Sequence, residues 1–98
     1  MAENTRKQTI LIVEDDSELA KIMQLELSHE GFSTELAGDG RTALEKISES
    51  KPALVLLDVM LPRLSGLEVL RKIRNEIDED LPVILVTARG ETIDKVDG

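Results

Sequence analysis

Residues 10–16 read ILIVEDD, and this stretch decides the fold. Its first four residues are apolar and mostly β-branched, and three acidic residues follow them without a spacer. A continuous apolar run of this length is typical of a strand buried on both faces, because a strand with one face in water alternates between apolar and polar residues. The sequence therefore predicts a central parallel strand with negative charge collected at its C-terminal end.

Two further apolar runs of the same kind lie downstream. ALVLL at 53–57 is followed at once by Asp58, and PVILV at 82–86 is followed by Thr87. A shorter alternating segment, from Phe32 to Leu36, predicts one more strand. These runs are too uniformly apolar for an antiparallel sheet with one exposed face, so we expect a buried parallel sheet.

Segments with helical periodicity separate the strands. The first lies between Asp16 and Gly31, the second between Asp39 and Pro52, and the third follows Ser65, so that each begins after a capping residue. The side chains expected to face inward are Ala43, Leu44 and Ile47 in the second helix, and Leu67, Leu70 and Ile73 in the third. Residues 91–98 are expected to begin a fourth helix. Strands that alternate with helices indicate an α/β domain with helices on both faces of the sheet.

Polar side chains follow three of the predicted strands at the point where each strand ends. They are Glu14 and Asp15 after the first run, Asp58 after the second and Thr87 after the third. Ligands of such sheets bind at the carboxyl ends of the strands, where these groups would meet. Neighbouring carboxylates repel one another unless a cation neutralises them, and a donor set made of oxygens favours a hard divalent ion such as Mg²⁺.

Asp58 differs from the other acidic residues because Leu57 and Val59 place it in the most apolar context. A carboxylate in such a position could attack phosphorus and form an acyl phosphate, with a metal ion offsetting the charge of the phosphoryl group. Thr87 could donate its hydroxyl to a phosphoryl oxygen, and the small Ala88 beside it leaves room for the ligand.

Composition excludes several other classes of function. The net charge of −8 argues against direct contact with nucleic acid by this segment, since phosphate contacts need clustered Lys and Arg. Without cysteine, and with His29 as the single histidine, the chain cannot form Cys-based or multi-His metal sites. No apolar run approaches the roughly 20 residues that span a membrane, and the polar start is unlike a signal peptide, so we expect a cytoplasmic protein.

Three segments together resemble the receiver domains of response regulators. They are ILIVEDD at 10–16, LLDVMLP at 56–62 with Gly66, and PVILVTAR at 82–89. The separations of 43 residues from Asp15 to Asp58 and of 29 residues from Asp58 to Thr87 are also similar to those of the family. The resemblance implies a flavodoxin-like, doubly wound parallel sheet with strand order 2-1-3-4. It implies an incomplete receiver domain at 9–98, preceded by a polar lead-in at 1–8.

The resemblance also implies a role for each residue of the site. Asp58 would be the phosphoacceptor, and the donor would be a phosphohistidine on a sensor histidine kinase. Asp15 and Asp58 would bind Mg²⁺ or Mn²⁺ directly, Glu14 would act through water, and the backbone carbonyl of Met60 would complete the metal site. Thr87 would be the switch hydroxyl. Such a domain belongs to a signalling pathway and is not itself an enzyme.

The chain departs from the family pattern at its end. The pattern continues with a fifth strand, a lysine that pairs with the phosphoryl group, and a last helix, whereas the last lysine here is Lys95, at a different position. From this we expect a truncated domain with no catalytic lysine. The strand at 83–86 would then have an exposed edge, which favours homo-oligomerisation or strand swapping.

The acidic residues also allow two other interpretations. An aspartyl-phosphate phosphatase of the haloacid dehalogenase type would need a second Asp two residues after the nucleophile, but Met60 occupies that position. A receiver-like binding or oligomerisation fragment without efficient phosphotransfer would agree with the absence of the lysine.

Overall fold

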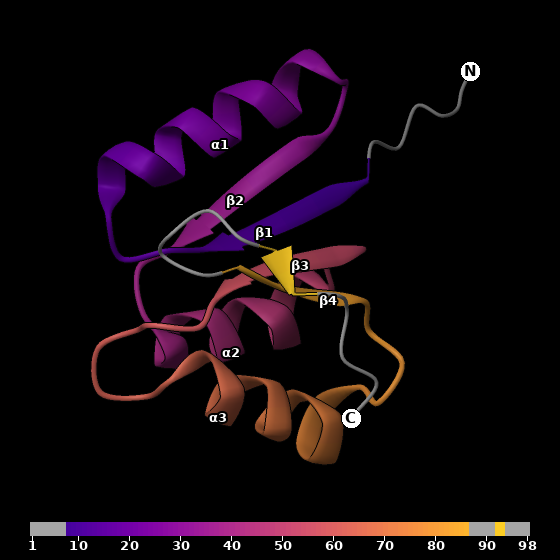
Figure 1. The fold of residues 1–98 in the computed structure, drawn as a ribbon. Coiled ribbons are helices and arrows are strands. Elements are labelled where there is room, and N and C mark those ends of the chain that lie inside the picture. Colours follow the sequence, from indigo (N-terminus) through magenta and orange to yellow (C-terminus); the bar gives the residue numbers. More distant parts are fainter. Residues whose placement is uncertain (1–7, 87–91, 94–98) are drawn as a thin grey trace, which may run out of the picture.

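The sheet lies between helices on its two faces (Figure 1). The computed structural model describes residues 8–86 and 92–93. In chain order the elements are β1 (Thr9–Val13), α1 (Ser17–His29), β2 (Ser33–Ala37), α2 (Gly40–Ser50), β3 (Leu54–Asp58), α3 (Gly66–Lys72), the π-helical turn η1 (Ile73–Ile77), β4 (Val83–Val86) and β5 (Thr92–Ile93). α1 packs on one face of the sheet, and α2 and α3 lie on the other.

The strands run in the order β2-β1-β3-β4-β5. The first four are parallel, with Val13 opposite Ala37 on one side and opposite Leu57 on the other, and with Asp58 opposite Val86. The predicted α/β architecture and the strand order 2-1-3-4 are therefore confirmed. β1 and β3 are neighbours in space although α1, β2 and α2 separate them in the sequence.

The prediction of a fourth helix is wrong at Thr92 and Ile93. These two residues form the short strand β5, which pairs antiparallel with β4 so that Thr92 lies opposite Val86 and Ile93 opposite Leu85. The predicted unpaired edge of β4 is wrong at Leu85 and Val86, because β5 pairs with these two residues. Residues 91 and 94–98 lie outside the described part of the chain.

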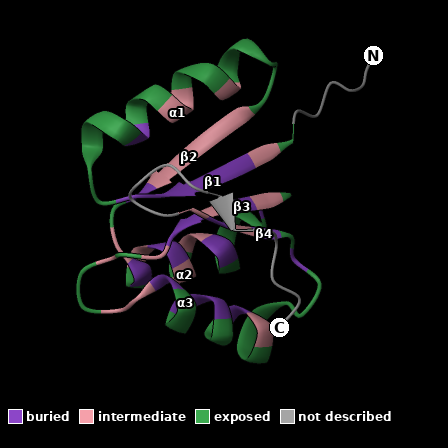
Figure 2. Ribbon diagram, in the orientation of Figure 1, coloured by how far each residue is buried: buried purple, intermediate pink, exposed green. Residues whose placement is uncertain are grey.

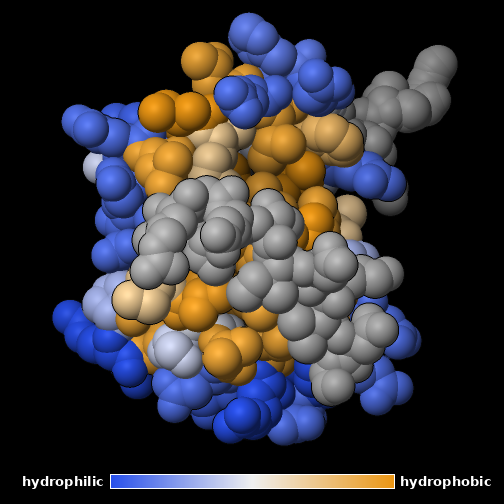
Figure 3. Space-filling view, viewed as in Figure 1, coloured by the Kyte–Doolittle hydropathy of each residue, from blue (hydrophilic) through white to orange (hydrophobic). Residues whose placement is uncertain are grey.

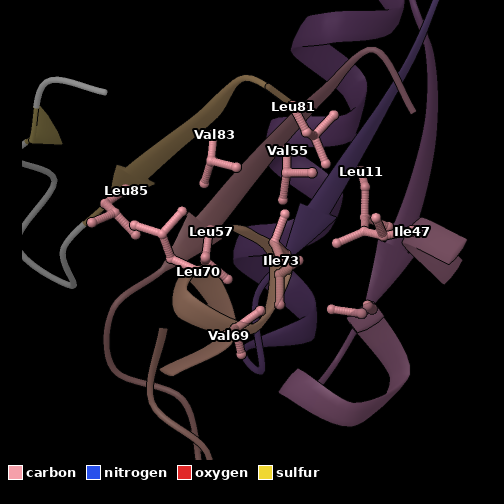
Figure 4. Close-up of a cluster of buried hydrophobic side chains, with 13 residues drawn as sticks. Leu11, Ile47, Val55, Leu57, Val69, Leu70, Ile73, Leu81, Val83 and Leu85 are labelled. Carbon is pink, nitrogen blue, oxygen red and sulfur yellow. The ribbon is translucent and has the colours of Figure 1, made fainter. Parts of the chain in front are cut away.

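A hydrophobic core lies between the sheet and the pair α2 and α3 (Figure 2). Figure 4 shows its side chains converging from β1, β3, β4 and the helices, and the labelled members are Leu11, Ile47, Val55, Leu57, Val69, Leu70, Ile73, Leu81, Val83 and Leu85. Ala43, Ile47, Leu70 and Ile73 face inward as predicted, and Leu44 packs against the margin of the core.

Leu67 was predicted to face inward, and this prediction is wrong because its side chain is 51% exposed. The buried stripe of α3 instead runs through Gly66, Val69 and Leu70 and continues to Ile73. Each step along a helix turns by about 100°, so the residue after Gly66 falls outside this stripe. Because the stripe begins with a glycine, which has no apolar side chain, apolar periodicity alone does not reveal it.

The opposite face of the sheet is covered less completely by the described residues. Ala20 is the buried residue of α1, whereas Ile22 is 56% and Leu25 is 60% exposed. Half-buried Leu56 and Ile84 belong to this side of β3 and β4. Figure 3 shows apolar residues at the surface around α1 as well as over the sheet. Among the described residues, the exposed apolar side chains of α1 make this side suited to contact with another apolar surface.

The ends of the helices follow local rules. Asp16 caps α1 by accepting hydrogen bonds from the amides of Glu18 and Leu19, and Gly31 follows the helix with a φ of 94°. α2 ends at Lys51, whose φ of 52° lies in the left-handed region, immediately before Pro52. These boundaries agree with those expected from the capping residues and from proline.

Candidate functional site

The register of β1 and β3 brings the acidic residues together. Because Val13 lies opposite Leu57, the next residue on each strand, Glu14 and Asp58, emerges at the same edge of the sheet. Each of Glu14, Asp15 and Asp58 offers a carboxylate oxygen, and these three oxygens lie within 4.8 Å of one another. The structure therefore brings together three of the residues that the sequence singled out, at the carboxyl ends of parallel strands.

Asp58 is the deepest of the three, with an exposed fraction of 5%. Its Oδ1 accepts a hydrogen bond of 3.0 Å from the backbone amide of Met60. The next residue, Val59, donates its amide to the carbonyl of Val86 at 3.0 Å, which extends the contact between β3 and β4 past the end of the strand. The carboxylate of Asp58 is thus held by its own loop, in an orientation set by the sheet.

Glu14 is also buried, with an exposed fraction of 9%. Its amide donates to the carbonyl of Ala37, and its Oε2 accepts from the amide of Asp16 at 3.1 Å. Burial raises the pKa of Glu14 to about 7, and the charges of Asp58 and Asp15 act in the same direction, although the Asp16 amide opposes them. Burial first, and the neighbouring carboxylates second, therefore disfavour the ionised form of Glu14.

Asp15 and Asp16 are both exposed, but they have different functions in the structure. The side chain of Asp16 is occupied by the N-terminus of α1, which settles the interpretation of this residue as a cap. Asp15 contributes its carboxylate to the acidic group instead. Of three consecutive acidic residues, two thus face the site, and the third starts the following helix.

Of the other residues predicted for the site, the structure describes Met60 but not Thr87 or Ala88. The amide of Met60 faces Asp58, as described above, and its side chain is exposed. Thr87 and Ala88 lie outside the described residues. One residue that the sequence reasoning undervalued is Gly66, whose amide donates to the carbonyl of Val59 at 2.9 Å and which therefore touches the segment that carries Asp58. A glycine at the first position of a capped helix was the available signal.

The donor set fits a hard divalent cation. All three side chains offer oxygen, and their close grouping would be stabilised by a cation bound among them. A buried carboxylate held beside such a cation is also suited to attack on phosphorus.

In the part of the chain that the structure describes, no helix has the length and apolar character that crossing a membrane requires.

Fold and site together define a doubly wound α/β domain with an acidic centre at the switch point of its sheet. Comparison with known families gives the same result, since the sequence profile described as "Response regulator receiver domain" matches residues 10–98. The chain belongs to this family.

Curated relatives are longer than this chain. It is 52% identical over 92 residues to the transcriptional regulatory protein YkoG of Bacillus subtilis, a match that covers 94% of the chain and 40% of YkoG. It is 43% identical over 95 residues to the DNA-binding response regulator MtrA of Mycobacterium tuberculosis, covering 97% of the chain and 41% of MtrA. The chain thus spans about two fifths of the length of these relatives.

Solved structures support the same fold. A putative response regulator from Chloroflexus aurantiacus aligns with a TM-score of 0.82 at 31% identity, covering 88% of this chain and 71% of that one. The response regulator protein TrrA from Thermotoga maritima, solved in complex with Mg²⁺-BeF, aligns with a TM-score of 0.79 at 37% identity, covering 83% of this chain and 70% of that one.

Proposed function

We propose that this chain is the phosphoacceptor receiver of a two-component phosphorelay and that Asp58 takes a phosphoryl group from a phosphohistidine on a sensor histidine kinase. The observation that carries this proposal is the arrangement of Asp58, which is buried, held by the Met60 amide and grouped with Glu14 and Asp15. Membership of the receiver family supports it.

In this reaction a carboxylate oxygen of Asp58 attacks the phosphorus atom. A P–O bond forms to Asp58 as the P–N bond to the donor imidazole breaks, and the imidazole leaves with the electron pair of that bond and takes up a proton. The Met60 amide holds Oδ1, so the orientation of the carboxylate is fixed before the donor arrives. A bound Mg²⁺ supplies neutralisation of the charge that accumulates between the carboxylates and the phosphoryl oxygens.

Residues of the acidic group would hold the ion. We assign Asp15 and Asp58 as direct ligands, Glu14 as a ligand through water and the backbone carbonyl of Met60 as a further ligand, with Mg²⁺ or Mn²⁺ as the ion. Thr87 would donate its hydroxyl to the phosphoryl group beside Ala88, on the side of β4. This assignment uses residues from three strand ends, as ligand sites of doubly wound sheets do.

The domain would act in the cytoplasm, with residues 9–98 forming an incomplete receiver domain and residues 1–8 a polar lead-in. The names of YkoG and MtrA refer to transcriptional regulation and DNA binding. The net charge of −8 argues against DNA binding by this segment. A DNA-binding output like that in the name of MtrA would therefore have to use another part of the protein.

A second candidate function is self-association with inefficient phosphotransfer. The exposed Ile22 and Leu25 on α1 favour it, since a second copy could cover this face. Strand swapping at β4 has less support, because β5 pairs with Leu85 and Val86. Sedimentation over a range of concentrations, with Ile22→Ser beside the unmodified chain, would test whether this face mediates association.

The phosphoacceptor proposal is tested by incubating the chain with Mg²⁺ and acetyl phosphate and measuring its intact mass. We expect a gain of one phosphoryl group that is lost in Asp58→Asn and kept in Asp80→Asn, an exposed aspartate far from the site in sequence. No gain at saturating donor would leave the binding function standing. Sustained hydrolysis of a generic phosphate ester would point to a phosphatase instead.

A further inference from the structure

We propose that Gly66 is a positioning residue for the acidic site, because the absence of a side chain there determines where Asp58 lies. The proposal rests on the proposed function, and it concerns a residue that is not itself assigned as a metal ligand. Two contacts carry it, one on each side of the first turn of α3.

On the first side, Gly66 lies directly against the peptide that links Asp58 to Val59. Its amide donates to the carbonyl of Val59 at 2.9 Å. A methyl group added at Gly66 would overlap the carbonyl oxygen of Asp58 and would approach the Cα of Val59 to 2.8 Å. Both are backbone atoms, so no side-chain rotation can relieve the overlap, and either α3 or the end of β3 must move.

On the second side, α3 has no room to retreat. Its fully buried Val69 packs on Gly40 at the start of α2 so closely that a methyl at Gly40 would lie 2.7 Å from Val69 Cγ2 and 3.0 Å from Leu64 Cδ2. A reciprocal capping box between Ser65 and Glu68 also fixes the first turn of α3. α3 is therefore held between two glycines, and a side chain at Gly66 would displace the end of β3.

Displacement of β3 at this point acts on the site itself. The segment from Asp58 to Met60 carries the carboxylate, the amide that holds its Oδ1, and the link from Val59 to Val86. Glu14 directly follows β1, and its amide donates to the carbonyl of Ala37 at the end of β2, so it is held by strands other than β3. The distance between the carboxylates would change, and binding of a divalent cation would weaken, even though alanine suits the interior of a helix better than glycine.

The experiment compares Gly66→Ala with two matched glycine variants. Gly40→Ala creates a contact of similar closeness with side chains of the core, whereas Gly38→Ala meets no atom within 4 Å. Mg²⁺ affinity is measured by isothermal titration calorimetry, and stability by urea unfolding. We expect Gly66→Ala to bind Mg²⁺ about tenfold or more weakly, as changes to groups that orient metal ligands do. Gly40→Ala should lose stability but keep its Mg²⁺ affinity within about twofold.

A double variant separates positioning from general damage. Val69→Ala removes the side chain that prevents α3 from retreating, so Gly66→Ala combined with Val69→Ala should recover Mg²⁺ affinity while losing further stability. Loss of stability alone cannot produce such a recovery. The inference is overturned if Gly66→Ala binds Mg²⁺ as the unmodified chain does, if Gly40→Ala loses as much affinity, or if the double variant shows no recovery.

A measurement on the unmodified chain covers the case in which Gly66→Ala does not fold. During a Mg²⁺ titration followed by amide NMR, the Gly66 signal should shift, whereas the signal of Gly31, after the far end of α1, should not. An unmoved Gly66 signal on a chain that binds Mg²⁺ overturns the inference. Failure of the unmodified chain to bind Mg²⁺ at all would instead refute the proposed function, and this inference with it.

Discussion

Replacement of Asp58 by asparagine is expected to stabilise the protein in the absence of divalent cations. The side chain keeps its size, and its carbonyl oxygen can still accept the hydrogen bond from the Met60 amide. The negative charge is lost from a group of three carboxylates whose oxygens lie within 4.8 Å of one another. The variant therefore removes repulsion and leaves packing almost unchanged.

The size of the effect follows from that distance. At 4.8 Å, two unit charges repel by about 1 kcal/mol at the dielectric constant of water and by about 3.5 kcal/mol at the effective value of about 20 used for protein sites. Asp15 is exposed, and Glu14 is partly protonated at neutral pH because burial raises its pKa to about 7. We therefore expect a net gain near the lower end, about 1–2 kcal/mol, which corresponds to about 5–10 °C in Tm for a domain of this size.

Thermal unfolding followed by circular dichroism at pH 7 in EDTA measures this gain. Asp80→Asn is the matched control, since it changes the net charge equally at an exposed position. Addition of Mg²⁺ should reverse the order of stability, because an ion at 100 times its Kd stabilises the unmodified chain by about 2.7 kcal/mol and should bind Asp58→Asn poorly. An Asp58→Asn variant no more stable than Asp80→Asn in EDTA would show that the carboxylates do not repel at the stated distance, and would refute the reasoning.

Three further predictions concern Glu14, the cap of α3 and the core. Because the pKa of Glu14 is raised to about 7 from 4.5, its contribution to stability is complete below about pH 4.5 and is lost as pH rises through about 7. Mg²⁺ affinity should rise over the same upper range with proton release, measurable by calorimetry in two buffers of different ionisation enthalpy; a flat pH profile would contradict this assignment. Ser65→Ala should cost about 1 kcal/mol in urea unfolding because it removes the capping box of α3, whereas Glu68→Gln should keep most of the cap; equal losses in both would argue against the box. Leu57→Ala should cost about 2–5 kcal/mol because its side chain is fully buried, and Leu25→Ala, on the exposed face of α1, should cost far less; similar costs would show that α1 is covered in solution.

The strands and the acidic centre could be predicted because their signals are local. Each apolar run forms a buried strand, and parallel strands place their carboxyl ends at one edge, so Glu14 and Asp58 had to meet once β1 and β3 were neighbours. The pairing of β1 with β3 is not encoded in the sequence of either strand alone. It follows from the topology that doubly wound sheets share.

The features that escaped prediction depend on tertiary contacts. Leu67 has the periodicity of a core residue, but the docking of Gly66 on β3 turns α3 so that Leu67 faces outward. The π-helical turn at Ile73–Ile77, closed by the Asp78 amide on the Ile73 carbonyl, has no signature in the sequence that we recognised. Thr92 and Ile93 form a strand because they pair with β4. The helical propensity of residues 91–98 contains no information on that tertiary contact.

The adjacency of β1 and β3 also sets an order of events during synthesis. The first 50 residues contain β1, β2 and the helices α1 and α2, yet they hold only Glu14 and Asp15 of the acidic group. β1 must wait for β3 before its second edge is paired, and such non-local pairing slows folding. Under the proposed function, a chain emerging from the ribosome would thus acquire affinity for a divalent ion only in a late step, when Leu57 docks beside Val13. The appearance of metal affinity during synthesis would then report the moment at which β3 docks on β1.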